Sequence, residues 1–587
     1  MSDTDGIMEC ALGAARFWIA ARERVDAIDA VPQAKALTVG LKNGWDCHLE
    51  PYTYQPLLEP DGIRVLRIFP WKERLQTIDG LYMPRCELIH LNLNSSPEYA
   101  TISYAWGSLL ENSPVLLHGQ NFLTVTNSLF EVICWTSIDT EEPLYFWADQ
   151  ICINQHDLVE RSKQVNMMGR IYKQATLTFV WLGKSGDTDE VAFDLIKKLS
   201  LDDLPLVKAY DTFLFKNVVR LQSILEPYGI GCNGSEPGWI AIKDLSLRPW
   251  FTRLWTFKSF GIYNTHLLHR QRNRYLTTSS TKLLDLLWEI SDSDYQCKDQ
   301  RDRVFSVLSL AGSDKSSTIN VDYSLSVAKV YLSVAREIIK STASLKILTR
   351  RRCGELEDLP SWAPNWSFGI SSQMALDTGN LSFSSSGGFQ HIYKESEEHI
   401  LIFKGKIIST IAKVASHNFT EHGDEYDSKD LEHFLGFKTL VPQILEELEG
   451  WPHVDGSFKR RTWGYWNWLL GMNFSAGNFG NRTDAYENGL DVADFMTNPR
   501  NRYERDLRKC FGRKIAILDT YGYPLGLVPD YARAGDNVCI LNGSTTPLVL
   551  RKNGQSFEVI GECYVNGIMY GEAVDWSQEG GETFVIK

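Results

Sequence analysis

The chain has 587 residues, of which 43% are hydrophobic, and its 60 basic and 73 acidic residues give a formal net charge of −13. A single hydrophobic core does not grow to this size, so we expect roughly three domains. The acidic balance, without a dense run of lysine and arginine, argues against nucleic-acid binding. The 11 cysteines include no Cys-x-x-Cys pair, so no disulfide framework and no metal site are predicted, and a reducing, cytoplasmic setting is expected.

Composition and periodicity divide the chain into six expected segments. They are a helical extension at 1–50, an α/β domain at 51–270, a helical annex at 271–350, a Trp/Pro turn with a loop and the first strands of a C-terminal module at 351–420, a helical insertion at 421–500 and a C-terminal β module at 501–587. The apolar run of the extension is interrupted by arginines, so it fits neither a signal peptide nor a membrane span.

The most informative stretch begins at positions 145–153, which are almost wholly apolar and rich in strand formers. This predicts a strand buried on both faces of a parallel sheet. Asp157 and Glu160 have the spacing of a capping box, so a helix with an apolar stripe is expected to begin there and to extend to Ala175. A second strand is predicted over 176–182, and a unit of this kind places its two strands in parallel.

Asp149 is the anomaly in this stretch, because a carboxylate inside a buried strand is costly unless it is paired or faces a crevice. Ligands of parallel sheets bind beyond the carboxyl ends of the strands. Another buried strand is predicted over 99–106, so Tyr104 and Trp106 should meet the same crevice as Asp149. The glycine that follows, Gly107, lets a ligand approach the backbone closely. Two polar residues after the Asp149 strand complete the predicted crevice: Asn154 and Gln155.

The other elements follow from the same periodicities. Strands are predicted at 63–69 and 86–93 as a lead-in hairpin, at 115–117 and 122–125 as a second hairpin, and at 262–268. Helices are predicted at 126–136, 188–200, 211–225, 248–260, 281–290, 302–311 and 325–339. Short strands are predicted at 399–414, 514–518, 537–541, 547–550 and 557–564. The expected fold is an α/β core with a helical annex, closed by a small antiparallel barrel or sandwich.

Four motifs and their spacing resemble the fungal heterokaryon-incompatibility (HET) domain family. They are YATISYAWG at 99–107, WADQICINQ at 147–155, Glu160-Arg161 with Gln164 and Tyr172, and RPWFTRLW at 248–255. The resemblance extends to the family's long-chain members through DQRDRVF at 299–305, VDYS at 321–324, LPSWAPNW at 359–366 and the segments around Asp536, Arg551 and 561–572. It implies a cytosolic protein of a filamentous fungus that acts in nonself recognition and programmed cell death. It also implies a flavodoxin-like α/β domain related to Toll/interleukin-receptor (TIR) domains.

The motif that ends near Trp255 departs from the family pattern. Most HET domains continue it as Trp-x-x-Gln-Glu, whereas this chain has Lys258 and Ser259 in place of Gln-Glu. TIR relatives that are enzymes hydrolyse NAD with a glutamate, whose charge stabilises the oxocarbenium-like state. A lysine at about 4 Å opposes such a state by a few kcal/mol, which disfavours NAD hydrolysis. Lys258 instead suits an anionic ligand such as a carboxylate, an enolate or a phosphate.

Asp149 is the first candidate for a catalytic acid or base, with Tyr104 and Arg253 as its catalytic partners. A buried carboxylate that ties down backbone amides or pairs with Arg253 is the alternative, and the sequence does not separate the two. Cys152 with His156 is a less favoured nucleophile and base, because the spacing of the two residues suits such a pair poorly, and an inert buried cysteine is the favoured alternative. Six residues are candidates for ligand binding: Trp106, Gly107, Asn154, Gln155, Trp255 and Lys258. No cofactor is predicted.

Three functions remain open. The first is a HET-type protein that mediates an incompatibility or death response by interaction, with the C-terminal module for regulation or partner recognition. The second is an enzyme recruited to fungal secondary metabolism, for instance for a cyclisation or dehydration in the crevice. The third is NAD hydrolysis with Asp149 or Glu160 in place of the missing glutamate. The expected partner is another protein or a small anionic ligand, without nucleic acid and without a membrane span, and self-association is kept as an alternative.

Overall fold

The computed structural model describes much of the chain and separates it into two compact units. The described residues are 39–40, 46–47, 49–76, 82–95, 97–108, 112–119, 121–138, 140–199, 237–255, 283–291, 295–308, 319–342, 344–349, 356–367, 383–388, 399–416, 512–520, 525–565, 567–576 and 581–587. The first unit comprises 1–282, 295–312 and 320–325, and the second comprises 283–294, 313–319 and 326–587. Several expectations lie outside the described residues: the extension up to residue 38, the helix at 211–225, the strand at 262–268, the insertion at 421–500, and Lys258 with Ser259.

The first unit is built on one mixed sheet. Its strands are β3 (Glu50–Pro51), β4 (Gly62–Ile68), β7 (Arg85–Asn92), β8 (Ala100–Tyr104), β9 (Asn112–Leu117), β10 (Asn121–Thr126), β11 (Leu144–Trp147) and β12 (Leu177–Trp181). The spatial order is β12-β8-β11-β4-β7-β9-β10-β3. Both β11 and β12 pair in parallel with β8, which lies between them, so the predicted parallel arrangement is confirmed. The two predicted hairpins, β4 with β7 and β9 with β10, are also present as antiparallel pairs.

The helices of the first unit are α2 (Asn127–Ser137), α3 (Asp149–Cys152), α4 (Leu158–Gln174), α5 (Asp189–Leu199), α8 (Pro237–Ser246), α9 (Pro249–Thr252) and α13 (Asp302–Leu308). Short pieces complete it: 3-10 turns η1 (Trp71–Glu73) and η2 (Leu93–Ser95), and the strand pairs β1 (Val39–Gly40) with β2 (Asp46–Cys47) and β5 (Leu75–Gln76) with β6 (Tyr82–Met83).

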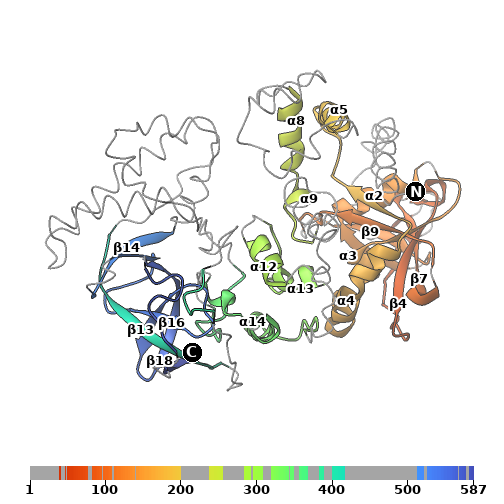
Figure 1. The fold of residues 1–587 in the computed structure, drawn as a ribbon. Coiled ribbons are helices and arrows are strands. Elements are labelled where there is room, and N and C mark those ends of the chain that lie inside the picture. The colour runs from red at the N-terminus through yellow and green to blue at the C-terminus, as the bar shows by residue number, and fades with distance from the viewer. Residues whose placement is uncertain are drawn as a thin grey trace, which may run out of the picture. The chain divides into compact units, whose positions relative to one another are not determined.

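Helices α2 and α4 cover opposite faces of the sheet. Trp135 of α2 packs on Phe179, which also contacts Phe146 of β11. The next residue of β11, Trp147, packs on Tyr172 of α4 with ring centroids 5.7 Å apart. Because successive strand residues point to opposite faces, the two helices enclose the sheet between them, and Figure 1 shows both beside it.

The predicted strand at 145–153 is wrong beyond Trp147. The chain turns at Ala148 into α3, and the N–H of Cys152 donates to the Ala148 carbonyl at 2.9 Å. The carboxylate of Asp149 accepts the N–H of Gln150 at 2.9 Å, so a local bond from side chain to backbone replaces a sheet hydrogen bond. Asp149 therefore lies just past the sheet rather than inside it.

The predicted helix at 248–260 is present at α9 but does not continue through residues 253–255, and residues 256–260 lie outside the described residues. Arg253 has extended dihedrals, with φ −77° and ψ 133°. The carbonyl of Gln296 accepts the N–H of Leu254 at 3.0 Å, and the N–H of Gln296 donates to the Thr252 carbonyl at 2.6 Å. The backbone groups that would have extended the helix pair instead with a segment more than 40 residues away in sequence, which no local periodicity reveals.

The second unit contains three helical segments and a β module. The helical segments are α12 (Leu283–Ser291), α14 (Val327–Thr342) and η4 (Lys346–Thr349). The strands are β13 (Leu401–Val414), β14 (Arg513–Leu518), β15 (Leu525–Pro529), β16 (Asn537–Leu541), β17 (Leu548–Asn553), β18 (Ser556–Glu562), β19 (Tyr564–Val565) and β20 (Glu582–Ile586). The predictions for 281–290, 302–311 and 325–339 are confirmed in α12, α13 and α14, with shifts of a few residues at their ends.

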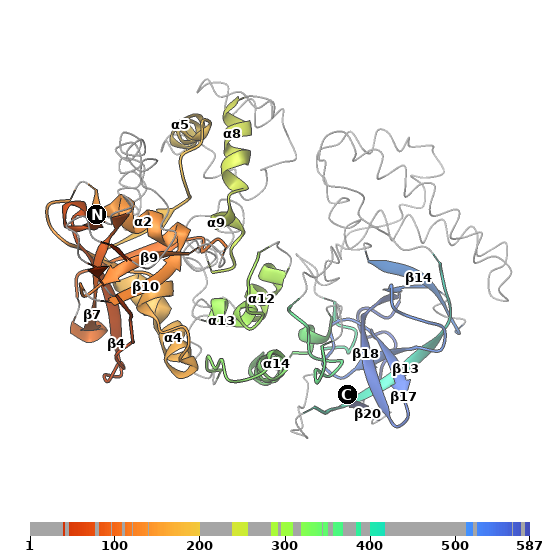
Figure 2. The same ribbon diagram turned by 180° about the vertical axis from the view of Figure 1, so that it is seen from behind.

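The β module closes on itself through β13. This long strand pairs with both β16 and β20, and β16 pairs with β17, β17 with β18, and β18 with β20. The ring β13-β16-β17-β18-β20 is therefore complete, while β14, β15 and β19 extend from the other part of β13 (Figure 2). The predicted C-terminal barrel or sandwich is confirmed, with the closed ring of a barrel, and all of its described strand pairs except β18 with β20 are antiparallel.

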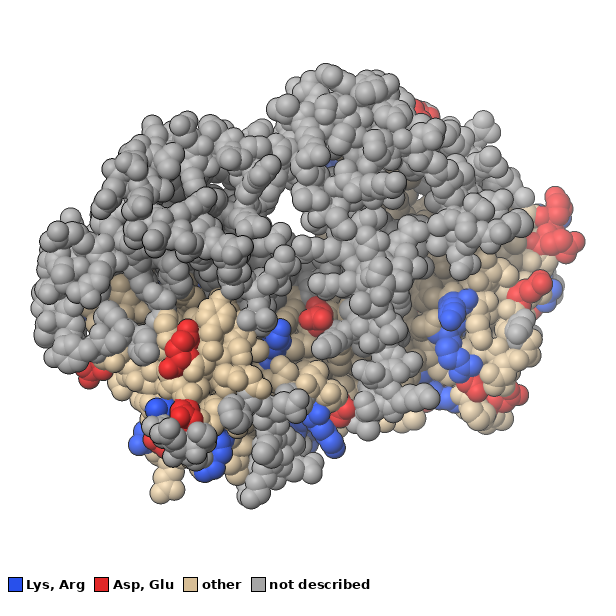
Figure 3. Space-filling view, in the orientation of Figure 1, with Lys and Arg blue, Asp and Glu red and all other residues tan. Residues whose placement is uncertain are grey.

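Charged side chains are mixed on the surface. On the face drawn in Figure 3, basic and acidic side chains of the described residues lie among one another. No helix within the described part of the chain combines the length and apolar character needed to cross a membrane.

Candidate functional site

Asp149 is held directly beyond the carboxyl end of β11, and Trp106 follows the end of the parallel strand β8. The Trp106 indole Nε1 donates to both carboxylate oxygens of Asp149 at 3.0 Å. With the Gln150 N–H, this gives the carboxylate three hydrogen-bond contacts from neutral donors. The structure thus joins Trp106 and Asp149 at the strand ends, where the sequence places the crevice.

Arg253 brings a positive charge to this cluster. Its Nη2 lies 3.8 Å from Asp149 Oδ2, and its Cζ lies 5.6 Å from the centre of the Trp106 ring. Its Nη1 donates to the backbone carbonyl of Tyr104. The Arg253 and Asp149 side chains are 21% and 18% exposed, so solvent reaches both members of the pair and screens their attraction.

Burial raises the pKa of the Asp149 carboxyl above its usual range, against the opposing effects of Arg253 and the Trp106 hydrogen bond. Tyr104 is only 2% exposed, and burial together with Asp149 raises its pKa well above the usual value. Its hydroxyl donates to Gln150 Oε1 at 3.5 Å, an oxygen that also accepts the N–H and hydroxyl of Thr126. Solvent therefore reaches the Asp149 carboxylate, whereas the Tyr104 side chain is buried.

Three of the residues predicted to bind a ligand, Gly107, Asn154 and Gln155, instead shape or bind the backbone around this cluster. Gly107 is exposed and has φ +71°, and a Cβ at this position would meet nothing within 4 Å, so glycine is required by the backbone conformation and not by a close approach. Gln155 Nε2 donates to the Asp149 backbone carbonyl at 2.8 Å. Asn154 uses its side-chain oxygen to accept the His156 N–H at 3.2 Å, which fixes the turn before α4.

Glu160 is not the capping-box acid that the spacing predicts. Asp157 caps α4 as expected, by accepting the N–H groups of Val159 and Glu160 at 3.0 Å. The Glu160 carboxylate instead binds Arg64 through both oxygens, at 2.5 and 2.8 Å, and accepts the Asn154 N–H. Arg64 is fully buried and the Glu160 side chain is 9% exposed, so this ion pair forms part of the core. Glu160 binds Arg64 in place of the predicted capping-box hydrogen bond to the helix end.

Cys152 is fully buried, and burial raises the pKa of its thiol to about 12. Its Sγ accepts the Ala148 N–H at 3.4 Å. A neutral thiol enclosed in this way is no nucleophile, which agrees with the inert cysteine that the sequence favours over a pair with His156.

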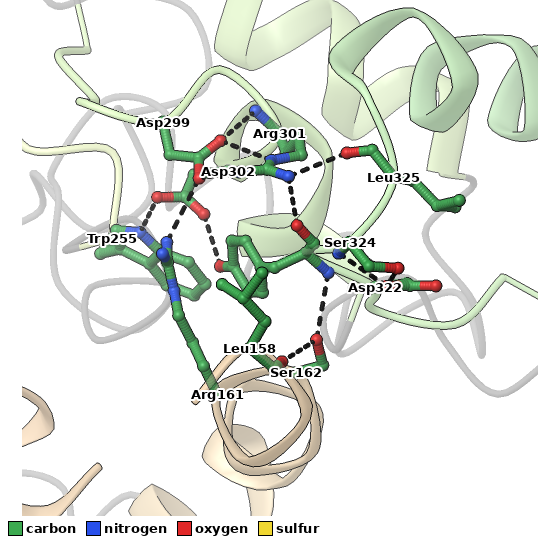
Figure 4. Close-up of polar contacts among 11 residues, drawn as sticks. Leu158, Arg161, Ser162, Trp255, Asp299, Arg301, Asp302, Asp322, Ser324 and Leu325 are labelled. Carbon is green, nitrogen blue, oxygen red and sulfur yellow. Dashed lines mark hydrogen bonds and ion pairs between the residues drawn. The ribbon is translucent and has the colours of Figure 1, made fainter. Parts of the chain in front are cut away.

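Trp255 belongs to a different cluster, centred on Asp302 and drawn in Figure 4. The Trp255 indole donates to Asp302 Oδ2 at 2.9 Å, and the Tyr323 hydroxyl donates to Oδ1 at 2.6 Å. Asp302 is 6% exposed, and burial raises the pKa of its carboxyl to about 6. Among the described residues no lysine or arginine lies within ion-pair distance of this carboxylate.

The arginines near Asp302 are committed to other acceptors. Arg301 binds both oxygens of Asp299, at 2.9 and 2.8 Å, and donates to the carbonyls of Tyr323 and Leu325. Arg161 of α4 lies 3.4 Å from Asp299 and stacks over the Tyr323 ring at 3.7 Å. These hydrogen bonds and ion pairs therefore connect the Trp255 segment to α4 through the motifs at 299–305 and 321–324. In the sequence, these two motifs carry only the resemblance to the family.

Sequence reasoning missed Gln150, Arg64 and Asp302 as members of these clusters. Each works through a partner far along the chain: Gln150 with Thr126, Arg64 with Glu160, and Asp302 with Trp255. Hydrophobic periodicity carries no information on such pairs. Within the described ranges, no group of three or more His, Cys, Asp and Glu side chains could hold a metal ion.

Comparisons with known proteins give one match in the α/β domain and another in the C-terminal β module. Residues 99–258 match the family described as heterokaryon incompatibility protein (HET), and residues 478–586 match the Het-6 β-barrel domain. The chain is also similar to heterokaryon incompatibility protein 6, OR allele, of Neurospora crassa, with 23% identity over 648 aligned positions that cover 85% of this chain and 93% of the relative. No solved structure gives a significant match.

The mixed α/β domain thus contains the match to the HET family, and the strands of the closed β barrel other than β13 lie within the match to the Het-6 β-barrel domain. Each family match covers part of the chain, and the similarity to heterokaryon incompatibility protein 6 extends over most of it. The resemblance found in the sequence motifs is thereby confirmed.

Proposed function

We propose that this protein triggers an incompatibility or cell-death response by binding a partner, and that the cluster of Asp149, Trp106 and Arg253 is the part of the HET domain on which that response depends. Its similarity to heterokaryon incompatibility protein 6 over most of the chain supports the general role. The site assignment rests on one observation: Asp149 keeps a carboxylate that is hydrogen-bonded, close to an arginine and still 18% exposed.

The exposure of this pair matters because Glu160, the acid of the motif that follows the one around Asp149, is unavailable. Both oxygens of Glu160 are occupied by the buried Arg64. Asp149 and Arg253 are separated by 3.8 Å, so an incoming group can compete with this loose, partly solvated contact while Trp106 and the Tyr104 carbonyl keep the two side chains in place. A carboxylate or guanidinium of a partner protein has the chemistry to do so.

The direct test is expression of the full chain from an inducible promoter in a filamentous fungus. We expect arrest of growth or loss of viability on induction. A matched control is Lys173→Gln, which removes one exposed charge on α4 and should leave the response intact. Normal growth of a strain that accumulates abundant soluble protein contradicts the proposal.

A second candidate is an enzyme that uses Asp149 as a general acid or base. The raised pKa of the Asp149 carboxyl favours it, since proton transfer near neutral pH is most efficient when the pKa approaches the working pH. A deletion strain would then lose a metabolite, and an unchanged product profile removes this candidate. For NAD hydrolysis, the paired state of Glu160 leaves Asp149 as the available acid, and incubation with NAD without release of nicotinamide excludes that reaction.

A further inference from the structure

One face of α13 carries buried donors that nothing in the described chain satisfies. Arg303 is 8% exposed, and its Nε and Nη1 have no hydrogen-bond partner among the described residues. One turn later on the same helix, Ser306 is fully buried, and its hydroxyl also lacks a partner in the described structure. Side chains three positions apart on a helix are neighbours, so the guanidinium and the hydroxyl project from the same face.

The acids nearest to Arg303 in sequence, Asp302 and Asp299, bind other side chains. Asp302 is held by Trp255 and Tyr323, on the helix face where Phe305 packs against the Tyr323 ring. At 3.6 residues per turn, Arg303 and Ser306 lie about 100° around the helix from that face. Asp299 is occupied by Arg301 and Arg161. No ion pair therefore links Arg303 to an acid within the described part of the chain.

Cys297 is the described neighbour of this guanidinium. Arg303 makes a side-chain hydrogen bond to Cys297, and this bond and the guanidinium charge lower the pKa of the thiol, but burial dominates and raises that pKa to about 11. The thiol is therefore neutral near pH 7 and supplies no counter-charge. Cys297 is partly exposed, so the cluster reaches the protein surface on this side.

A guanidinium stays protonated in proteins, and burying it without an anion is strongly unfavourable. Guanidinium and hydroxyl donors together match the acceptor chemistry of carboxylate and phosphate oxygens. We propose that Arg303 and Ser306, with Cys297 at the entrance, form a binding site for a small oxyanion, separate from the Asp149 cluster. The ligand is a phosphate or carboxylate group, and its charge completes the packing of α13.

Titration calorimetry and thermal unfolding of the full chain test this site, with inorganic phosphate and acetate as separate probes and sodium chloride at matched ionic strength as the reference. We expect one or both oxyanions to bind and to raise the unfolding temperature above that in chloride, and the two arms distinguish a phosphate site from a carboxylate site. Arg303→Gln should weaken binding about 10-fold to 100-fold, because it removes a charge-assisted donor. Ser306→Ala should weaken it about fivefold. Lys173→Gln, which removes one exposed charge, should bind as the unchanged chain does.

A purely structural Arg303 gives a different result. Arg303→Met keeps the side-chain volume and removes the uncompensated charge, so in chloride we expect it to unfold at the same or a higher temperature than the unchanged chain. The proposal is overturned if neither oxyanion raises the unfolding temperature, or if the Met and Gln variants respond to them as the unchanged chain does. Loss of stability of Arg303→Met in chloride also overturns it, because it would show that Arg303 is satisfied within the protein. None of these outcomes depends on a growth phenotype, so failure here leaves the proposed function untouched.

Discussion

The regions around Asp149 and Asp302 differ in how they hold a carboxylate, although each uses a tryptophan indole as a donor. Asp149 has Arg253 at 3.8 Å and is 18% exposed. Asp302 is 6% exposed and is bound by neutral donors, with the pKa of its carboxyl raised to about 6. The first region keeps a charge accessible to solvent, while in the second region burial opposes ionisation of the carboxyl more strongly than the hydrogen bonds from Tyr323 and Trp255 favour it. The difference supports the proposal that the first region binds a partner, while the contacts of the second region connect distant segments of the chain.

The largest expected loss of stability comes from removing the charge of a fully paired carboxylate, Glu160. Glu160→Gln leaves Arg64 buried with an uncompensated charge, because Arg64 is fully buried and the pair is bidentate. We expect the free energy of unfolding to fall by about 3–5 kcal/mol in urea titrations. Lys173→Gln on the exposed face of the same helix should change it by less than about 0.5 kcal/mol. A loss below about 1 kcal/mol for Glu160→Gln would show that the pair is solvated in solution.

The next effect tests the enclosed nature of Asp302 through pH. Its carboxyl has a pKa of about 6 in the folded protein and an ordinary value of 3.8, so the folded state binds the proton more tightly. The contribution of this group to stability is fully present below pH 3.8 and is lost as the pH rises through about 6. This difference corresponds to ~3 kcal/mol. Asp302→Asn should remove that part of the pH dependence in unfolding curves recorded from pH 4 to 8, and an unchanged pH dependence would place Asp302 in contact with solvent.

A smaller effect is expected where solvent already screens the charge. Arg253→Met removes the cation near Asp149 and the donor to the Tyr104 carbonyl. Because both charged side chains are partly exposed, we expect a loss of about 1–2 kcal/mol in unfolding free energy. The variant should also titrate Asp149 at a higher pH, since Arg253 opposes the rise of its pKa. A loss as large as that of Glu160→Gln would remove the distinction between the two kinds of carboxylate.

Much of this architecture follows from local sequence patterns. The parallel strands β8 and β11 are predicted from their apolar runs, and their parallel pairing brings Trp106 to Asp149 as the crevice argument requires. The closing barrel is likewise predicted from short strands between glycine turns. Periodicity succeeds here because burial of one or both faces of an element leaves a repeat in the residues that form it.

The failures at Glu160, Arg253 and Trp255 share a physical cause, which is pairing over long sequence distances. Glu160 binds Arg64, 96 positions away, instead of the adjacent helix end. The segment at Arg253 leaves the helix to pair with Gln296, and Trp255 reaches Asp302. Asp536 and Arg551, which carry part of the family resemblance, form an ion pair at 2.8 Å inside the barrel module. Spacing within one motif cannot indicate which distant motif receives its hydrogen bond or charge.

Asn substitutions at Asp149 and Asp302, tested side by side, measure the central claim directly. Asn keeps an acceptor for the indole in each cluster and removes the charge, so both variants should fold, as unfolding curves at neutral pH will verify. Growth after induction in a filamentous fungus is the readout. The account predicts that Asp149→Asn abolishes the growth arrest while Asp302→Asn retains it. Retained arrest in a stable Asp149→Asn strain, at equal protein levels, contradicts it.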